Sequence, residues 1–251
     1  MKYRYFIKLS YKGTHYHGWQ VQPNAISVQE VLTKAFSTIL RQETEITGAG
    51  RTDTGVHAIN YIAHFESNIA NIDKDDKIVF KLNSFLPKDI AIYNIAKVQN
   101  DAHARFDAQS RTYKYYIHQK KDPFLLESSW FVSKQLDIEQ MNKACKVLFD
   151  YTDFTSFSKL HTDVKTNNCK ITNAFWVQHD YKIIFTISAD RFLRNMVRAI
   201  VGTLIEVGRG KLSIDGFKKI IESENRSNAG ISVPAQGLFL TEINYPPDIY
   251  M

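Results

Sequence analysis

Hydrophobic and polar residues alternate at the start of the chain. In residues 3–10, YRYFIKLS, every second position carries a large apolar side chain, and Arg4 and Lys8 lie between them. A period of two is typical of a strand with one buried face. Comparable patterns predict further strands at residues 57–67, at 111–119, in a hairpin over 176–189 that turns near His179-Asp180, and at 237–245.

Apolar residues recur three and four positions apart in residues 27–42, SVQEVLTKAFSTILRQ. Ser27 and Glu30 have the spacing of a capping box at the start of this segment. The segment therefore predicts a helix with one apolar face. Further helices are predicted at residues 137–150, 191–210 and 213–223, and glycines end the long one at 191–210.

The order of these elements predicts an α+β fold. We expect two similar RRM or ferredoxin-like units, each with a mainly antiparallel sheet flanked by helices, and a cleft between them. The predicted units are an N-terminal subdomain over residues 1–105 and a C-terminal subdomain over residues 106–251. A chain of this length can bury such cores without disulfides or metals.

Composition narrows the class of protein. The two cysteines, Cys145 and Cys169, have no CxxC spacing, so neither a disulfide scaffold nor a zinc ribbon is expected. The N-terminus has no apolar signal-peptide core, and no apolar run reaches the length of a membrane span. We therefore expect a cytoplasmic protein without a membrane segment.

The balance of charge is modestly basic. The chain carries 32 Lys and Arg against 26 Asp and Glu, a net charge of +6. Residues 1–125 contain 17 basic against 12 acidic side chains, so most of the excess lies in the first half of the sequence. A basic excess suits a polyanionic partner such as RNA, although many basic proteins bind nothing acidic.

Common cofactor motifs do not occur. The sequence has no GxxxxGK[ST], GxGxxG, HExxH or GxSxG pattern, so nucleotide, dinucleotide, zinc-protease and serine-hydrolase interpretations lack support. His15 and His17 form an HxH pair without an evident third ligand nearby, and no metal site is predicted. The expected cofactor requirement is none.

The stretch GAGRTDTGVHA, residues 48–58, surrounds one acid with glycines. Asp53 is the only carboxylate between Glu45 and Glu66, and Arg51 lies two residues before it. Asp53 could simply occupy a turn. Glycines also let backbone approach a bulky group, and Arg51 offers a charge for a phosphate. A strand follows directly and would support the loop rigidly.

Other polar and aromatic residues have simpler interpretations. Arg191, Arg194 and Arg198 would form one stripe of the predicted helix, which alone could be a solvated basic face. The tyrosines of the strand at 111–119 could be sheet packing, and Cys145 lies on the apolar face of a predicted helix and is expected in the core.

Five segments, in order, resemble one family. GRTDTGVHA (50–58) is similar to the catalytic signature GRTDAGVHA of the TruA family of tRNA pseudouridine synthases. YKGTHYHGWQVQ (11–22) resembles that family's N-terminal segment, and ARFDAQSRTYKYYI (104–117) resembles its tyrosine-bearing strand. FLRNMVRAIVGTLIEVGRG (192–210) resembles its arginine helix, and GISVPAQGLFL (230–240) resembles its C-terminal segment. The visible departure is Thr54, where the family usually has Ala.

The resemblance implies the isomerisation of uridine to pseudouridine in RNA. The bond between uracil N1 and ribose C1′ breaks, the base turns, and C5 bonds to C1′, without a cofactor. The implied essential carboxylate is Asp53, which either adds to C1′ or removes a ribose proton. Arg198 is implied as the cation that favours its charged form.

The resemblance also assigns substrate contacts. Tyr113 would stack on the flipped uracil and could assist the loss of the C5 proton. Leu238 would close the pocket wall, and Arg51 would stabilise the extruded nucleotide. Arg194, with Arg191, would face RNA or solvent.

The implied substrate is the anticodon stem-loop of tRNA, at uridines 38, 39 and 40, and the implied assembly is a homodimer. Three alternatives remain: the same reaction on another RNA or position, a non-catalytic RNA-binding protein of the same fold, and a hydrolase that uses Asp53. A two-carboxylate hydrolase would need an acid partner, and the loop supplies none.

Overall fold

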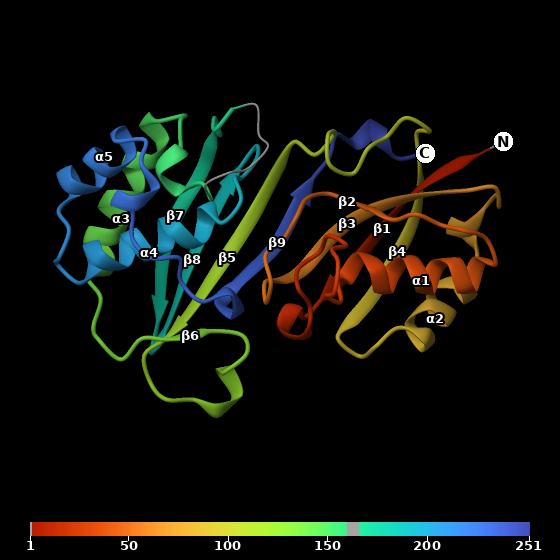
Figure 1. Cartoon of the computed structure of the whole chain (residues 1–251), viewed down its shortest axis with the longest axis horizontal. Coiled ribbons are helices and arrows are strands. Elements are labelled where there is room, and N and C mark those ends of the chain that lie inside the picture. The colour runs from red at the N-terminus through yellow and green to blue at the C-terminus, as the bar shows by residue number, and fades with distance from the viewer. Residues whose placement is uncertain (1, 160–165) are drawn as a thin grey trace. The chain divides into compact units, whose positions relative to one another are not determined.

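The computed structural model describes residues 2–159 and 166–251, and the chain divides into two compact units (Figure 1). One unit comprises Met1–Gln109 together with Leu240–Met251, and the other comprises Ser110–Phe239. The C-terminal segment therefore folds with the N-terminal unit. In both units antiparallel strands are accompanied by helices, which confirms the predicted α+β class.

The first unit is built on β1 (Tyr3–Tyr11), which pairs antiparallel with both β3 (His57–Ser67) and β4 (Ile90–Val98). The short β2 (Thr47–Gly48) and the later part of β9 (Leu238–Asn244) also belong to this sheet. The predicted strands at 3–10, 57–67 and 237–245 are thus confirmed.

The two faces of β1 are buried to different extents. Tyr5, Ile7 and Leu9 are fully buried, as their alternation predicted. Phe6 points to the other face and is also buried, in a cluster with Ile249 and the C-terminal segment. The C-terminal segment packs over Phe6. This contact explains why Phe6 is buried although the sequence pattern predicts that its side of the strand faces solvent.

Helix α1 (Val28–Leu40) begins and ends at identifiable signals. The hydroxyl of Ser27 accepts a hydrogen bond from the amide of Glu30 at 3.2 Å, as the capping-box spacing predicted. Arg41 adopts a left-handed conformation at the C-terminal end. The apolar face of the helix buries Leu32 and Phe36 completely.

Helix α2 (Asp76–Phe85) and strand β4 of this unit were not predicted. Helix α2 buries only Ile78 and Leu82, while Phe80 stays exposed, so its apolar stripe is too narrow to stand out in sequence. A signal was nevertheless present at its start, because the Asp75 carboxylate accepts a hydrogen bond from the amide of Lys77.

The second unit carries β5 (Ser110–His118), β8 (Lys182–Ala189) and β7 (Ile171–His179) in that order, all antiparallel. The two-residue β6 (Trp130–Phe131) runs parallel to the end of β5. The predicted strand at 111–119 and the hairpin near His179-Asp180 are confirmed, and Asp180 has the positive φ of +52° that a tight turn requires.

Three helices accompany this sheet: α3 (Ile138–Val147) packs against β7, and α4 (Met196–Gly208) and α5 (Ile214–Glu222) pack against α3. The helices at 137–150 and 213–223 are confirmed, and Cys145 is buried as expected. Burial raises the pKa of the Cys145 thiol to about 12, so it remains a neutral core group.

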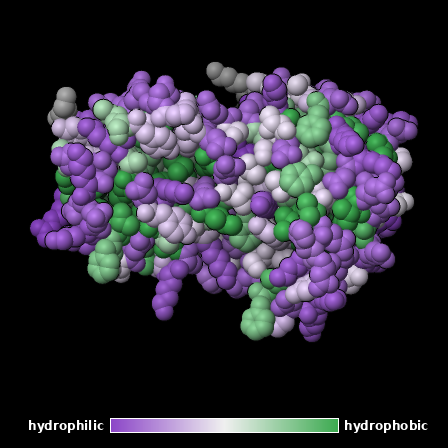
Figure 2. Space-filling view, turned by 180° about the vertical axis from the view of Figure 1, so that it is seen from behind, coloured by the Kyte–Doolittle hydropathy of each residue, from purple (hydrophilic) through white to green (hydrophobic). Residues whose placement is uncertain are grey.

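One face of the molecule is mostly polar. Figure 2 shows hydrophilic side chains over most of one face, with hydrophobic ones gathered in smaller patches between them. Among the described residues, no helix is both long enough and apolar enough to cross a bilayer.

Candidate active site

The glycine-rich loop starts against an aromatic pair in the first unit. The rings of Trp19 and Tyr61 stack with centroids 4.1 Å apart. The Tyr61 hydroxyl bonds to both backbone polar groups of Gly50, accepting from the amide and donating to the carbonyl. A Cβ at Gly48 would lie 2.3 Å from that hydroxyl and 2.4 Å from the indole. Gly48 therefore makes room for the protein's own aromatic rings.

Gly50 differs from Gly48. A Cβ built on Gly50 meets no heavy atom of the described residues within 4 Å. The space beside Gly50 is thus open to an incoming group, while the space beside Gly48 is filled. A side chain is therefore excluded at Gly48 by neighbouring rings but is not excluded by packing at Gly50. The sequence alone does not distinguish these two cases.

The segment between β1 and α1 packs on the middle of the loop. The amide of Gly13 donates to Nδ1 of His57 at 2.9 Å, and a Cβ at Gly13 would lie only 2.0 Å from the carbonyl oxygen of Val56. A Cβ at Gly18, which has φ +86°, would lie 2.2 Å from the carbonyl oxygen of Thr52. Backbone therefore touches backbone on both sides of Asp53.

Asp53 begins a tight turn. The amide of Val56 donates to the carbonyl of Asp53 at 3.1 Å, and Gly55 has φ +78°. Glycine with positive φ at the third position is what a type II turn requires. Asp53 is partly exposed and Thr54 is exposed. The sequence's turn interpretation is therefore correct for the backbone of Asp53, and it leaves the role of the carboxylate open.

Tyr16 forms a hydrogen bond with the same turn. Its carbonyl accepts from the amide of Gly55 at 3.4 Å, and its hydroxyl donates to Oδ1 of Asp89 at 2.6 Å. Burial and the neighbouring Asp89 carboxylate raise the pKa of Tyr16 well above its usual range, so the phenol stays protonated as a donor. The importance of Tyr16, Tyr61 and Trp19 was missed by the sequence reasoning, although all three lie in predicted segments.

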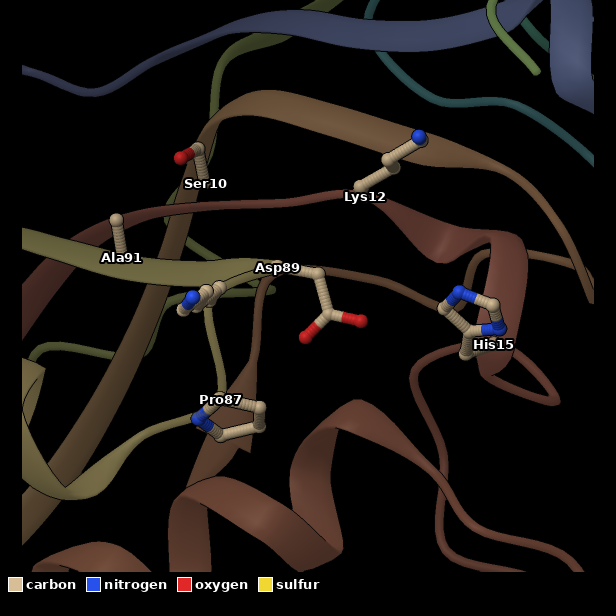
Figure 3. Close-up of a pocket in the computed structure, with 7 residues that line it drawn as sticks. Ser10, Lys12, His15, Pro87, Asp89 and Ala91 are labelled. Carbon is tan, nitrogen blue, oxygen red and sulfur yellow. The ribbon is translucent and has the colours of Figure 1, made fainter. Parts of the chain in front are cut away.

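A hollow of about 500 Å³ adjoins Asp89 (Figure 3). Its lining comes from the end of β1, the following segment, the turn before β4 and the start of β4. It consists of Ser10, Lys12, His15, Pro87, Lys88, Asp89 and Ala91. Asp53 does not line it. Among the described residues, no group of three side chains is arranged to hold a metal ion.

Tyr113 lies on β5 of the second unit, opposite Ile187. Its ring is partly buried and meets Phe192 edge-on at 5.1 Å. Two residues on, Tyr115 is fully buried and donates to the carbonyl of Pro234 at 2.8 Å. Sheet packing thus accounts for Tyr115, whereas Tyr113 retains surface for a ligand.

Arg198 lies in the first turn of α4 and is partly buried. Its Nε donates to the carbonyl of Val233 at 2.7 Å, and the amide of Val233 donates to the carbonyl of Arg198 at 3.3 Å. The segment around Val233 lies so close to the helix that a Cβ at Gly202 would be 1.9 Å from the carbonyl of Ile231. Leu238, further along this segment, is buried.

The predicted arginine stripe is wrong. Helix α4 begins at Met196, so Arg191 and Arg194 precede it and only Arg198 is helical. Asn195 has φ +68°, which interrupts helical geometry, and its side chain donates to Ser232 at 2.6 Å. The carbonyl of Arg194 accepts from the amide of Lys159. These contacts bind the residues before Met196 to neighbouring loops, so that the helix starts only at Met196.

The predicted site residues divide between the units. Asp53 and Arg51 belong to the first unit, and the second holds Tyr113, Arg194, Arg198 and Leu238. Each half is positioned by its own backbone contacts. The pairing of Asp53 with Arg198 stays a prediction.

Comparison with known proteins covers almost the whole chain. The family model described as tRNA pseudouridine synthase matches residues 8–107 and 144–246. A protein of Bacteroides fragilis named tRNA pseudouridine synthase A is 60% identical over 98% of both chains. A protein of Porphyromonas gingivalis with the same name is 54% identical over 99% of both chains. A protein of Clostridium perfringens named tRNA pseudouridine synthase A 2 is 42% identical over 95% of this chain and 98% of its own.

Proposed function

The chain belongs to the tRNA pseudouridine synthase family, and we propose that it converts uridines 38, 39 and 40 of the tRNA anticodon stem-loop to pseudouridine. The reaction is an isomerisation. The N1–C1′ bond breaks, the C5–C1′ bond forms, and the proton on C5 is finally exchanged for one on N1. The detached uracil must be held while water is kept away from C1′.

Asp53 is the proposed catalytic carboxylate. Its position at the start of a turn that backbone contacts fix on both sides supports this role, because a reacting group must be held within a fraction of an ångström. As an ionised group it either adds to C1′ or removes a proton from the ribose. The open side of Gly50 offers the room that a flipped nucleotide needs.

Arg198 is the proposed counter-charge. The bond from its Nε to Val233 orients the guanidinium, and the terminal nitrogens at the other end can hold both oxygens of a carboxylate. A fixed cation favours the charged form of Asp53 in a site that excludes water. Lysine has a single ammonium and could not reproduce this arrangement.

The remaining contacts hold the base and the nucleotide. We assign Tyr113 to stacking on the flipped uracil, and its hydroxyl to assisting the loss of the C5 proton. Leu238 forms an apolar wall, Arg51 stabilises the extruded nucleotide, and Arg194 contacts the RNA backbone. Stacking of one base on an aromatic ring contributes about 1–3 kcal/mol, comparable with the few kcal/mol that flipping costs.

We further propose a cytoplasmic homodimer with one tRNA lying across both subunits. A unit of this size presents too little surface to hold a whole tRNA by itself. Size-exclusion chromatography with light scattering would give a mass near twice 29.0 kDa. A monomer that retains full activity would contradict the dimer without affecting the assigned reaction.

The observation that carries the proposal is the family match over both units together with the fixed turn at Asp53. Mapping of pseudouridine in tRNA from cells that lack the protein tests it. We expect positions 38–40 to lose the modification. If those positions stay modified while other sites become unmodified, the protein performs the same reaction on another target. If no site changes, a non-catalytic RNA-binding role becomes the better account.

A further inference from the structure

The net charge lies entirely in the second unit. Of the 32 Lys and Arg residues, 13 lie in the first unit, which leaves 19 in the second, and the 26 Asp and Glu divide into 13 and 13. The first unit is therefore neutral and the second carries +6. Dividing the sequence at its midpoint hides this, because Arg111, Lys114, Lys120 and Lys121 fall in the first half but fold in the second unit. Contacts to the RNA backbone should be concentrated on the second unit.

Lysines gather around one ring at an end of this unit's sheet. Lys120 follows β5, Lys182 begins β8, and Tyr181 lies in the β7–β8 turn. The Nζ atoms of Lys120 and Lys182 lie 5.3 Å and 5.6 Å from the centroid of the Tyr181 ring. Lys121 is exposed beside them. We call Lys120, Lys121, Lys182 and Tyr181 the lysine platform. Figure 1 shows the ends of β5, β7 and β8 meeting there, next to β6.

Hydrogen bonds fix the platform. The amide of Gln119 donates to the carbonyl of Tyr181 at 2.8 Å. The Tyr181 hydroxyl donates to Oδ2 of Asp122 at 3.2 Å, while Oδ1 of Asp122 accepts from the amide of Phe124. Asp122 therefore holds the ring and the adjoining turn in place. A preformed aromatic base beneath two cations lowers the ordering cost of binding a ligand.

Two acids lie beside the three lysines: Asp122, which accepts from the Tyr181 hydroxyl, and Asp180, which pairs with Lys120. Asp180 lies 3.7 Å from Lys120, and both side chains are about 70% exposed, at 72% and 70%. Ion pairs so exposed contribute little in water, and a phosphate can readily replace the carboxylate. The platform thus retains a positive excess that suits phosphodiesters.

The platform is remote from the proposed stacking residue. Tyr113 and His118 are five positions apart on β5, which corresponds to about 17 Å at the usual rise per residue of a strand. The platform begins just beyond His118. A single nucleotide therefore cannot reach from the ring of Tyr113 to the ammonium group of Lys120.

We propose that the lysine platform binds backbone phosphates of the tRNA outside the anticodon stem-loop. This inference rests on the proposed function, since it takes tRNA as the substrate. The platform would give whole tRNA a higher affinity than an isolated stem-loop, and it would do so without touching the reacting nucleotide. Backbone contacts of this kind fix the position of an RNA without reading its sequence.

An exposed apolar neighbour suggests a competing partner. Phe124 is 91% exposed and lies in the turn that Asp122 caps. A protein, including a second copy of this chain, could cover Phe124. The two lysines over one ring and the +6 charge of the unit favour RNA, because charged residues are depleted from the core of protein interfaces.

The test compares two RNAs and two variants. Lys120, Lys121 and Lys182 are replaced together by Gln, and a matched control replaces the exposed Lys74, Lys77 and Lys81 of the neutral unit. Binding is measured against whole tRNA and against a hairpin containing only the anticodon stem-loop, between 50 and 300 mM KCl. For the platform variant we expect Kd for whole tRNA to rise about tenfold and the salt slope to fall by about 2–3, as three phosphate contacts predict.

The other readouts should stay constant. Affinity for the hairpin, kcat at saturating tRNA, thermal stability and oligomeric mass should match the parent, and the control triple should match it throughout. Unchanged affinity for whole tRNA would overturn the proposal, as would equal losses on tRNA and hairpin. A loss of oligomeric mass would instead assign the surface to a protein partner. A parent that binds tRNA but forms no pseudouridine would contradict the proposed function alone.

Discussion

Arg198 and Val233 are joined by two hydrogen bonds in opposite directions. The Nε of Arg198 donates to the carbonyl of Val233, and the amide of Val233 donates to the carbonyl of Arg198. Backbone contacts to Val233 therefore help to position the guanidinium. Substitutions at Arg198 should therefore not be tolerated, because they remove a guanidinium that this backbone holds in place.

Arg198→Lys should remove the Nε donor and the two-pronged end while keeping the charge. We expect kcat to fall about 100-fold or more, in the range seen when a single preorganised donor is lost. The Kd for tRNA and the melting temperature should change little. Single-turnover kinetics with radiolabelled tRNA measures the rate of the chemical step, which reports the change in kcat. Arg194→Lys, outside the helix, is the matched control and should retain kcat; a comparable loss there would mean that the charge of the region matters, not the geometry at Arg198.

Gly48→Ala should destabilise the protein. The new methyl would overlap the Tyr61 hydroxyl and the Trp19 indole, and such overpacking costs about 1–3 kcal/mol. Gly50→Ala is its matched partner, because the methyl meets open space and Gly50 has no positive φ. Chemical denaturation should show a loss for Gly48→Ala only. If Gly50→Ala keeps its stability but loses activity, the open space beside it is used by the nucleotide; equal stability of both variants would refute the packing account of Gly48.

Strand β3 carries a buried histidine, His64, that should make stability depend on pH. Burial, and then His103 and Arg4, lower the pKa of His64 from 6.5 to about 4. His64 accepts the amide hydrogen of Ala104 at Nδ1 in its neutral form. Between pH 6.5 and 4 the unfolded chain takes up a proton that the folded chain refuses. Stability from this group is complete above pH 6.5 and is lost as pH falls towards 4.

Denaturant titrations between pH 4 and 8 would show this slope. His64→Gln should flatten the profile in that window. The depressed pKa of His103 acts in the same direction, so some slope should persist in His64→Gln. A profile identical to that of the parent would rule out His64 as the main source.

Local signals predicted most of the fold. The alternation at Tyr5, Ile7 and Leu9 and the cap at Ser27 each depend on neighbours within a few positions, and each gave the right element. Helix α2 was missed because two buried residues do not make a visible stripe. The start of α4 was misplaced because tertiary contacts of Asn195 and Arg194 override a pattern that would suit a helix.

The candidate site was harder to predict than the fold. The sequence pointed to Asp53 through an isolated acid among glycines, but it grouped those glycines under one role. Only the structure separates Gly48, which faces Trp19 and Tyr61, from Gly50, which faces open space. Val233 carries no chemical signal in sequence, because its contribution to positioning Arg198 comes from its backbone.

The central claim is that the carboxylate of Asp53 performs the chemistry. The most direct measurement is the pseudouridine yield of Asp53→Asn at positions 38–40 of purified tRNA, with tRNA binding and melting temperature measured on the same preparation. Asn has nearly the same shape and lacks the charge, so we expect no detectable product while tRNA is still bound and the fold is retained. Product formed by Asp53→Asn at the rate of the parent would contradict the account.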